Sequence, residues 1–168
     1  MRHVLGVLVE NQPGVLAKVA GLFSRRGFNI ESLAVGTTED PTVSRMTIVV
    51  EGDENVIEQV AKQLNKLIDV IRVADIAKDS VARELALIKV HTTPATRNEI
   101  IQIVSVFRAQ VVDISKDSLI IEITGDQDKV SALQEMLKDF GIKEMVRTGI
   151  IAVDRGNRLI KNNNFKEE

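Results

Sequence analysis

One order of apolar patterns occurs twice along this chain, and this repeat constrains the fold more than any other feature. In each half a strand-like run leads into a helix-like run, and two strand-like runs follow. A second helix-like run then leads into a last strand. The pair Gly52-Asp53 opens the second helix-like run of the first half, and Gly125-Asp126 takes the same place in the second half. Six elements in the same order indicate two copies of one module rather than one larger fold.

Each copy can be placed on the sequence by its periodicity. In the first copy, strand patterns cover 3–9, 29–35, 44–51 and 69–75, and helical spacing covers 14–26 and 54–67. In the second copy, strand patterns cover 84–90, 110–115, 119–124 and 142–153, the last interrupted near Gly149. Helical spacing there joins Ile100 to Phe107 and Val130 to Phe140.

A β-α-β-β-α-β module forms one antiparallel four-stranded sheet with two helices on one face, an α+β fold of the ferredoxin-like kind. We therefore predict two tandem ferredoxin-like modules. The predicted boundaries are a first domain at 1–76, a linker at 77–83, a second domain at 84–155 and a polar C-terminal tail at 156–168.

The second strand of such a module lies at an edge of the sheet. Here its sequence is FNIESLAV, residues 28–35. Its candidate edge residues are Phe28, Ile30, Glu31, Leu33 and Val35. It has one charge and no proline, so it lacks the usual protection of an edge against pairing. This predicts a docking surface, most simply for the same edge of a second copy, and hence a homodimer.

Composition excludes several classes of partner. Lys and Arg number 22 against 24 acidic residues, and the net charge of −2 gives no electrostatic reason to expect nucleic acid or an anionic membrane. The absence of cysteine excludes disulfides, thiolate zinc sites and cysteine nucleophiles. No apolar run approaches roughly 18 residues, and the chain enters a strand pattern directly, so we expect neither a membrane span nor a signal peptide. We expect a cytoplasmic protein.

Other uses of this strand order need residues that the chain lacks. RNA-recognition modules stack bases on aromatic residues of the central strands. This chain has no Tyr or Trp, and none of its five Phe lies in 3–9 or 44–51. Acylphosphatase-type enzymes need an arginine in the first strand-to-helix loop, which has none. The two histidines, His3 and His91, belong to different modules. We therefore expect no catalytic site, metal site or cofactor on this chain.

The first strand-to-helix corner reads Asn11-Gln12-Pro13-Gly14, and two interpretations are open. These residue types are common in turns, so the corner can be a turn with a helix cap. The helix start, expected at Pro13-Gly14, can also bind a carboxylate through backbone N–H groups of Gly14, Val15 and Leu16. Asn29 is similarly open, since it can fill a turn after Gly27 or reach the corner of a second copy.

Several motifs in the first half carry a family resemblance. They are PGVL at 13–16, GLFSRRGFNIESL at 21–33, the acidic turn Asp40-Pro41 and SRMTI at 44–48. Over roughly the first 75 residues the chain resembles the small regulatory subunit of acetolactate synthase (acetohydroxyacid synthase). The second half agrees with that family in order and length. The first half resembles an ACT domain, an amino-acid-sensing module.

The resemblance implies more than the residue patterns do. It implies that two ACT domains pair edge to edge, with valine bound between them as a feedback inhibitor of branched-chain amino acid biosynthesis. The effector-binding positions implied by the match are Asn11, Gly14, Val15, Leu16, Asn29 and Ile30, with Gln12 and Pro13 flanking them. It also implies a large catalytic subunit that this chain activates. Thiamine diphosphate, Mg and FAD are expected on that subunit, and no cofactor on this chain.

The same corner of the second copy reads His91-Thr92-Thr93-Pro94-Ala95, without the asparagine and the glycine. We expect it to bind no amino acid, and the second module to serve docking or activation instead. The alternative function is a constitutive activating or assembly subunit whose amino-acid site is vestigial or suited to another ligand.

Overall fold

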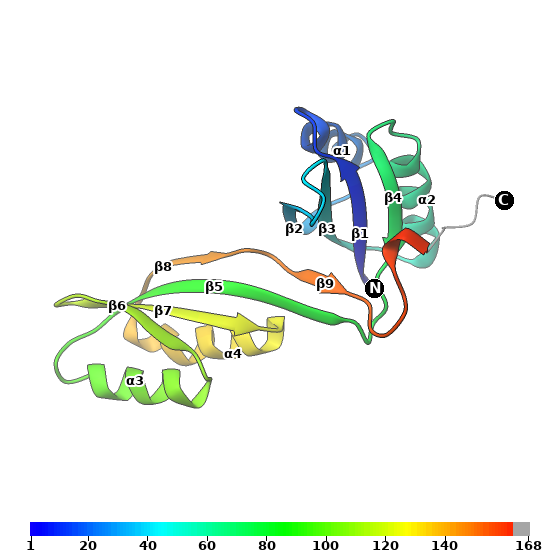
Figure 1. Cartoon of the computed structure of the whole chain (residues 1–168). Coiled ribbons are helices and arrows are strands. Elements are labelled where there is room, and N and C mark those ends of the chain that lie inside the picture. Colours follow the sequence, from blue (N-terminus) through cyan, green and yellow to red (C-terminus); the bar gives the residue numbers. More distant parts are fainter. Residues whose placement is uncertain (163–168) are drawn as a thin grey trace. The chain divides into compact units, whose positions relative to one another are not determined.

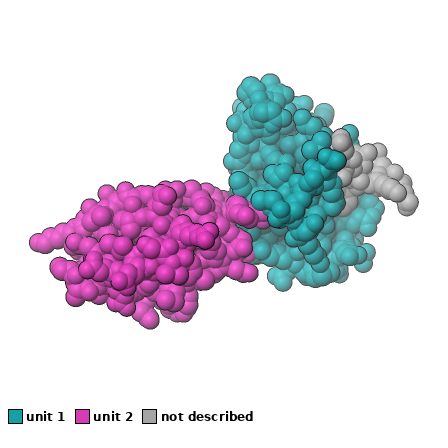
Figure 2. All heavy atoms as spheres, turned by 60° about the horizontal axis from the view of Figure 1, so that its bottom comes forward, with its two compact units in different colours: residues 1–81, 150–168 teal, residues 82–149 magenta. Residues whose placement is uncertain are grey.

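The structure of this protein, a computed structural model, describes residues 1–162 and contains two compact units. The first unit comprises residues 1–81 and the segment that begins at Ile150, and the second comprises residues 82–149 (Figure 2). Each unit contains one copy of the expected six-element repeat, which confirms the tandem ferredoxin-like fold.

The first unit is one antiparallel sheet in the order β2-β3-β1-β4, with α1 and α2 on one face (Figure 1). Its elements are β1 (Arg2–Glu10), α1 (Val15–Arg25), β2 (Ile30–Thr37), β3 (Val43–Glu51), α2 (Glu54–Asn65) and β4 (Val70–Asp75). The second strand therefore lies at an edge, as predicted. After the second unit the chain returns with β9 (Ile151–Val153) and the 3₁₀ turn η2 (Ile160–Asn162).

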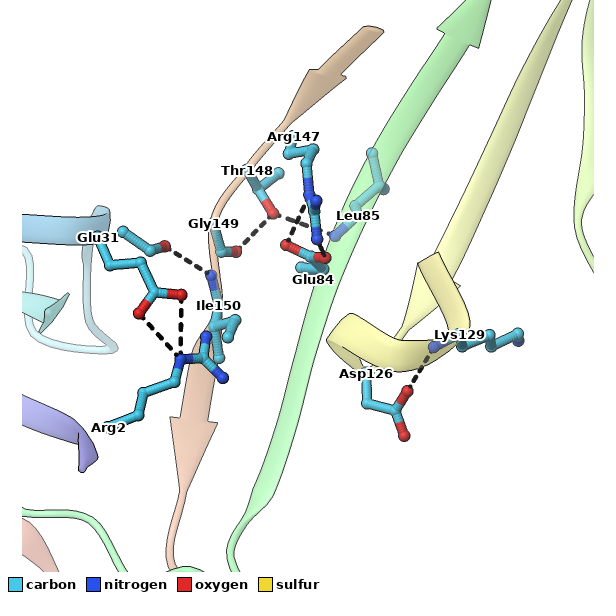
Figure 3. A network of polar contacts seen from close by, with 11 residues as sticks. Arg2, Glu31, Glu84, Leu85, Asp126, Lys129, Arg147, Thr148, Gly149 and Ile150 are labelled. Carbon is cyan, nitrogen blue, oxygen red and sulfur yellow. Dashed lines mark hydrogen bonds and ion pairs between the residues drawn. The ribbon is translucent and has the colours of Figure 1, made fainter. Parts of the chain in front are cut away.

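The second unit repeats this arrangement in the order β6-β7-β5-β8, with α3 and α4 on one face (Figure 1). Its elements are β5 (Val81–His91), α3 (Arg97–Val106), β6 (Gln110–Ile114), β7 (Ser118–Gly125), α4 (Gln127–Leu137), the 3₁₀ turn η1 (Lys138–Phe140) and β8 (Ile142–Arg147). Glu84 of β5 is buried, and its carboxylate is paired with the guanidinium of Arg147 on β8 (Figure 3). This pair compensates a carboxylate that burial would otherwise make costly.

Each unit has its own apolar core, where the helices meet the inner face of their sheet. In the first core, alternate residues of β1 and β3 pack against α1 and α2. The largest side chains fully buried there are Leu5, Phe23, Met46, Ile48, Ile57 and Leu64. The second core is built in the same way from β5, β7, α3 and α4, with Ile88, Ile100, Leu119, Ile121, Ile123 and Leu133 fully buried. The two sets share no residue, which accounts for the two units.

The chain divides differently from the boundaries expected at its C-terminal end. Residues 150–162 belong to the first unit, whereas the expected second domain extended to 155. Arg45 donates a hydrogen bond to the Ala152 carbonyl oxygen at 2.7 Å, and the Ala77 N–H donates to Asp154 Oδ1 at 2.8 Å. Ile160 is buried against Leu8 on the outer face of the sheet. Apolar alternation predicted a strand at 142–153 but could not show which unit its end would join.

Two further boundaries differ. The expected linker at 77–83 is shorter, because β5 begins at Val81. The expected polar tail at 156–168 includes buried Ile160, and its residues 163–168 lie outside the described part of the chain.

Candidate functional site

The helix α1 begins in an unusual way. Gly14 is its N-cap residue, with φ of 85° in the left-handed region, and it provides no side-chain cap. Glycine adopts this conformation without the steric cost that a Cβ brings. The helix begins at Val15, directly after Gly14, which agrees to within one residue with the start expected at about Pro13-Gly14.

The backbone donors at this start are only partly used. The Val15 N–H faces the Gln12 carbonyl oxygen at 3.5 Å, and the first helical bond runs from the Lys18 N–H to the Gly14 carbonyl oxygen. The N–H groups of Leu16 and Ala17 thus lie in the first turn, where a helix offers no acceptor. In contrast, α2 has Asp53 as its N-cap residue, and the Asp53 carboxylate accepts the Val56 N–H. Likewise α4 has Asp126, whose carboxylate accepts the Lys129 N–H (Figure 3).

Asn11 is held beside this start by the turn between β2 and β3. Its Nδ2 donates to the Pro41 carbonyl oxygen at 3.0 Å, and its backbone N–H donates to the Thr42 carbonyl oxygen at 2.8 Å. The turn is itself ordered by Asp40, whose Oδ1 accepts hydrogen bonds from the hydroxyl and the N–H of Thr42. These bonds favour the ionised form and lower the pKa of Asp40. Asn11 Oδ1 keeps its capacity to accept a hydrogen bond.

The next two residues of the corner differ in what they can offer. The Val15 side chain is 4% exposed and belongs to the first core, so only its backbone can face a ligand. The Leu16 side chain is 46% exposed and could contact the aliphatic part of a ligand. The sequence analysis included Val15 and Leu16 among the candidate residues. It could not show that Val15 offers only its backbone whereas Leu16 also offers its side chain.

Asn29 lies just after the C-terminal cap of α1. That cap is a Schellman motif, in which the Phe28 N–H reaches the Phe23 carbonyl oxygen at 3.0 Å and Gly27 has φ of 71°. The rings of Phe23 and Phe28 pack edge to face at 6.5 Å between centroids. The cap is complete without Asn29, whose exposed side chain makes no hydrogen bond to the described residues. The turn-filling interpretation therefore has no contact to support it.

At the edge strand β2, the backbone is more accessible to a partner strand than the apolar side chains are. Phe28, Ile30 and Leu33 pack partly against the first core, whereas Val35 is 46% exposed. Glu31 is paired with Arg2 at 3.2 Å (Figure 3). Within the described chain β2 pairs with β3 alone, so the outer backbone groups of β2 are open to another strand.

The matching corner of the second unit contains a side-chain turn just before α3, although α3 itself, like α1, has no side-chain cap. The Thr93 hydroxyl accepts from the Thr96 N–H at 3.2 Å, and the Thr96 hydroxyl accepts from the Thr93 N–H at 2.9 Å. Thr92 is buried. This reciprocal pairing uses the hydroxyl and N–H groups of the two threonines before the helix, where the first unit has Asn11 and Gly14 instead. The residue types alone suggested the difference between the two corners, but the Thr93–Thr96 pairing was not predicted.

Residues 1–162 contain no group of three or more His, Asp or Glu side chains placed to hold a metal ion. No helix in the same range is long and apolar enough to cross a membrane.

Comparison with known proteins decides the family. A family model for the AHAS small subunit-like ACT domain matches residues 5–72, and a model for the small subunit of acetolactate synthase matches residues 83–156. A protein of Archaeoglobus fulgidus named "Probable acetolactate synthase small subunit" is 62% identical over 94% of this chain and 99% of its own. The chain belongs to the acetolactate synthase small-subunit family.

Other members of the acetolactate synthase small-subunit family agree over the same length. The acetolactate synthase small subunit of Mycobacterium leprae is 57% identical over 94% of each chain. The crystal structure of the acetolactate synthase small subunit from Thermotoga maritima has a TM-score of 0.89 and 45% identity, covering 94% of this chain and 99% of that one. The resemblance carried by the motifs of the first half is thereby confirmed, and so is the ACT domain.

Proposed function

We propose that this chain is the regulatory subunit of a cytoplasmic acetolactate synthase in branched-chain amino acid biosynthesis. It binds valine at the start of α1, activates the large catalytic subunit and makes that subunit sensitive to feedback inhibition. The names of its relatives support the assignment to this enzyme. The open corner of the first unit supports the amino-acid site.

One observation carries the proposal for the site. The start of α1 has no side-chain cap, is exposed, and lies beside Asn11, whose Oδ1 can still accept. A free amino acid needs donors for its carboxylate and an acceptor for its ammonium group. The N–H groups of Leu16 and Ala17 are the donors, aided by the helix dipole, and Asn11 Oδ1 is the acceptor. The exposed Leu16 side chain contacts the aliphatic part of valine.

A second copy of the chain completes this site. The open backbone of β2 pairs with β2 of the second copy, so that the two ACT sheets join edge to edge. Asn29 and Ile30 of one copy then reach the Gly14 corner of the other. Asn29 is suited to this role because it is exposed and makes no hydrogen bond within its own described chain.

Valine regulates through the difference between its affinities for two states of the complex. It inhibits only if it binds the inhibited state more tightly than the active one. The second unit, whose corner has threonines in place of Asn11 and Gly14, serves activation of the catalytic subunit rather than sensing.

Equilibrium binding to the isolated protein tests the site directly. Titration with valine, leucine and isoleucine should show saturable binding, with one site formed per corner of the dimer. Saturable binding of none of the three up to millimolar concentrations, with activation of the catalytic subunit intact, would replace the proposal with a constitutive activating subunit.

A further inference from the structure

A cavity of about 570 Å³ lies on the outer face of the first unit's sheet, away from its helices. Its walls are the turn between β2 and β3, the outer side of β1 and β3, and residues 153–161. All of these residues belong to the first unit. The volume is within the range of small-molecule sites, roughly 300–1,000 Å³. None of the proposed valine-binding residues lines it.

Two guanidinium groups line this cavity with donors to spare. Arg45 is half-buried, and its Nη2 donates to the Ala152 carbonyl oxygen at 2.7 Å. Burial removes water from its charge and lowers its pKa, although the nearby charge of Asp154 opposes this effect. Arg158 is half exposed, and its Nε lies 3.9 Å from Asp154 Oδ2, too far for a hydrogen bond. A guanidinium has five N–H donors, so each of the two arginines can donate hydrogen bonds to a further partner.

The carboxylates around the cavity are already engaged or closed off. Asp154 is 3% exposed at its side chain and accepts from the Ala77 N–H, while its Oδ2 is buried without a hydrogen bond. Glu39 pairs with Lys161 at 3.7 Å at the exposed rim. Asp40 is exposed and holds Thr42. The charged side chains of the whole lining balance, with Arg45, Arg158 and Lys161 against Glu39, Asp40 and Asp154. Away from the rim, however, two guanidinium groups face the single carboxylate of Asp154, and this local excess of positive charge favours an anion.

The rest of the inner surface is apolar. Leu8 and Ile160 are buried against each other, and Val43 packs partly against them. Ile76 lies close by, because both it and Ile160 are within 3.0 Å of where a Cβ on Gly6 would stand. A ligand that fits both parts of the wall has a charged head and a short apolar body.

We propose that this cavity is a second ligand site, which binds a small aliphatic carboxylate with its carboxylate on Arg45 and Arg158 and its chain over Leu8, Val43 and Ile160. An arginine pair recognises carboxylate and phosphate by the same two-pronged hydrogen bonding. The apolar wall favours an aliphatic carboxylate over inorganic phosphate, since phosphate has no apolar part to contact that wall.

The test titrates the full-length protein with isobutyrate, acetate and inorganic phosphate and follows backbone amide shifts by NMR. Isobutyrate should bind saturably and more tightly than acetate or phosphate, and it should move amides of 37–45 and 151–161. Arg45→Gln and Arg158→Gln should each weaken it roughly tenfold or more, the effect of losing a charged hydrogen bond. Lys66→Gln removes an exposed positive charge at the end of α2 and should leave the binding unchanged.

Three outcomes would overturn the site. In the first, isobutyrate binding does not saturate even well above the millimolar range. In the second, neither Arg45→Gln nor Arg158→Gln changes isobutyrate binding. In the third, phosphate binds more tightly than isobutyrate. Arg158 is half exposed, so its variant remains informative if Arg45→Gln fails to fold. Isobutyrate resembles valine, and a Gly14→Asp variant therefore serves as a second control. Loss of isobutyrate binding in that variant would place the ligand at the α1 corner instead. This conclusion does not depend on whether valine regulates the enzyme.

Discussion

At the N-terminal end of α1, the left-handed backbone of Gly14 stands where α2 and α4 have a capping aspartate. An aspartate at the N-cap would accept the free N–H groups of the first turn. Gly14 leaves them unoccupied, and a Cβ built on it meets no atom within 4 Å. At the scale of single residues, this is what makes the corner able to bind an anion.

Replacing Gly14 by Asp should therefore abolish valine inhibition while activation of the catalytic subunit is retained. The new carboxylate would occupy the donors and repel the carboxylate of valine. The measurement is activity of the reconstituted complex against valine concentration. Gly14→Asn has nearly the same shape, tolerates positive φ and can cap the same N–H groups without a charge, so the difference between the two variants measures the charge repulsion alone. An unchanged inhibition curve for Gly14→Asp would show that the site is misplaced.

Asn29→Ala should weaken valine binding by about tenfold, because one hydrogen bond to a charged ligand is lost. The melting temperature of the protein should not change. The reason is that the Asn29 side chain makes no hydrogen bond to the described part of its own chain. Asn11→Ala provides the contrast, since it removes the bond to Pro41 and should lower the melting temperature as well. Calorimetry of both variants checks this. A marked loss of stability in Asn29→Ala alone would make Asn29 a structural residue.

At the scale of elements, the proposed sensing of valine depends on the edge strand β2. Its backbone is open on one side, and Val35 is its large exposed apolar side chain. Two β2 strands that pair across a dimer would bring Val35 of each copy close to the other.

Val35→Lys should therefore shift the protein from dimer to monomer and weaken valine binding with it, because charge on an edge strand opposes pairing. Ile68→Lys is the control, as Ile68 is 92% exposed in the turn before β4. Sedimentation equilibrium gives the oligomeric state of both. If Val35→Lys remains a dimer that binds valine normally, the copies pair through another surface.

Most elements followed from periodicity, because the two halves bury the same faces of the same strands and helices. What the start of α1 can bind did not follow, since the residue types at 11–14 fit a capped turn as well as an anion site, and the missing side-chain cap is seen only in the structure. Periodicity also could not separate buried Val15 from exposed Leu16, which are adjacent at the helix start. The side of the helix on which each lies is set by its packing.

At the scale of the whole molecule, the segment after the second unit is part of the first. The sequence could not show this, because alternation at Ile151–Val153 is the same whichever unit the strand joins. What decides it is tertiary contact, through Arg45, Asp154 and Ile160.

A fragment that ends at Ala77 should therefore be less stable than residues 1–81 joined by a flexible Gly-Ser linker to residues 150–162. The difference should be about 2 kcal/mol or more in free energy of unfolding, from burial of Ile160 alone. Denaturant unfolding of both fragments measures it. Equal stability would mean that the returning segment contributes nothing to the first unit.

We propose that this chain makes acetolactate synthase sensitive to valine through the corner at Gly14. The activity of the catalytic subunit, measured alone and reconstituted with this chain, each with and without valine, tests this most directly. We predict that the chain raises activity and that valine lowers the raised activity in a saturable way. Activation that valine leaves unchanged at every concentration would contradict the account.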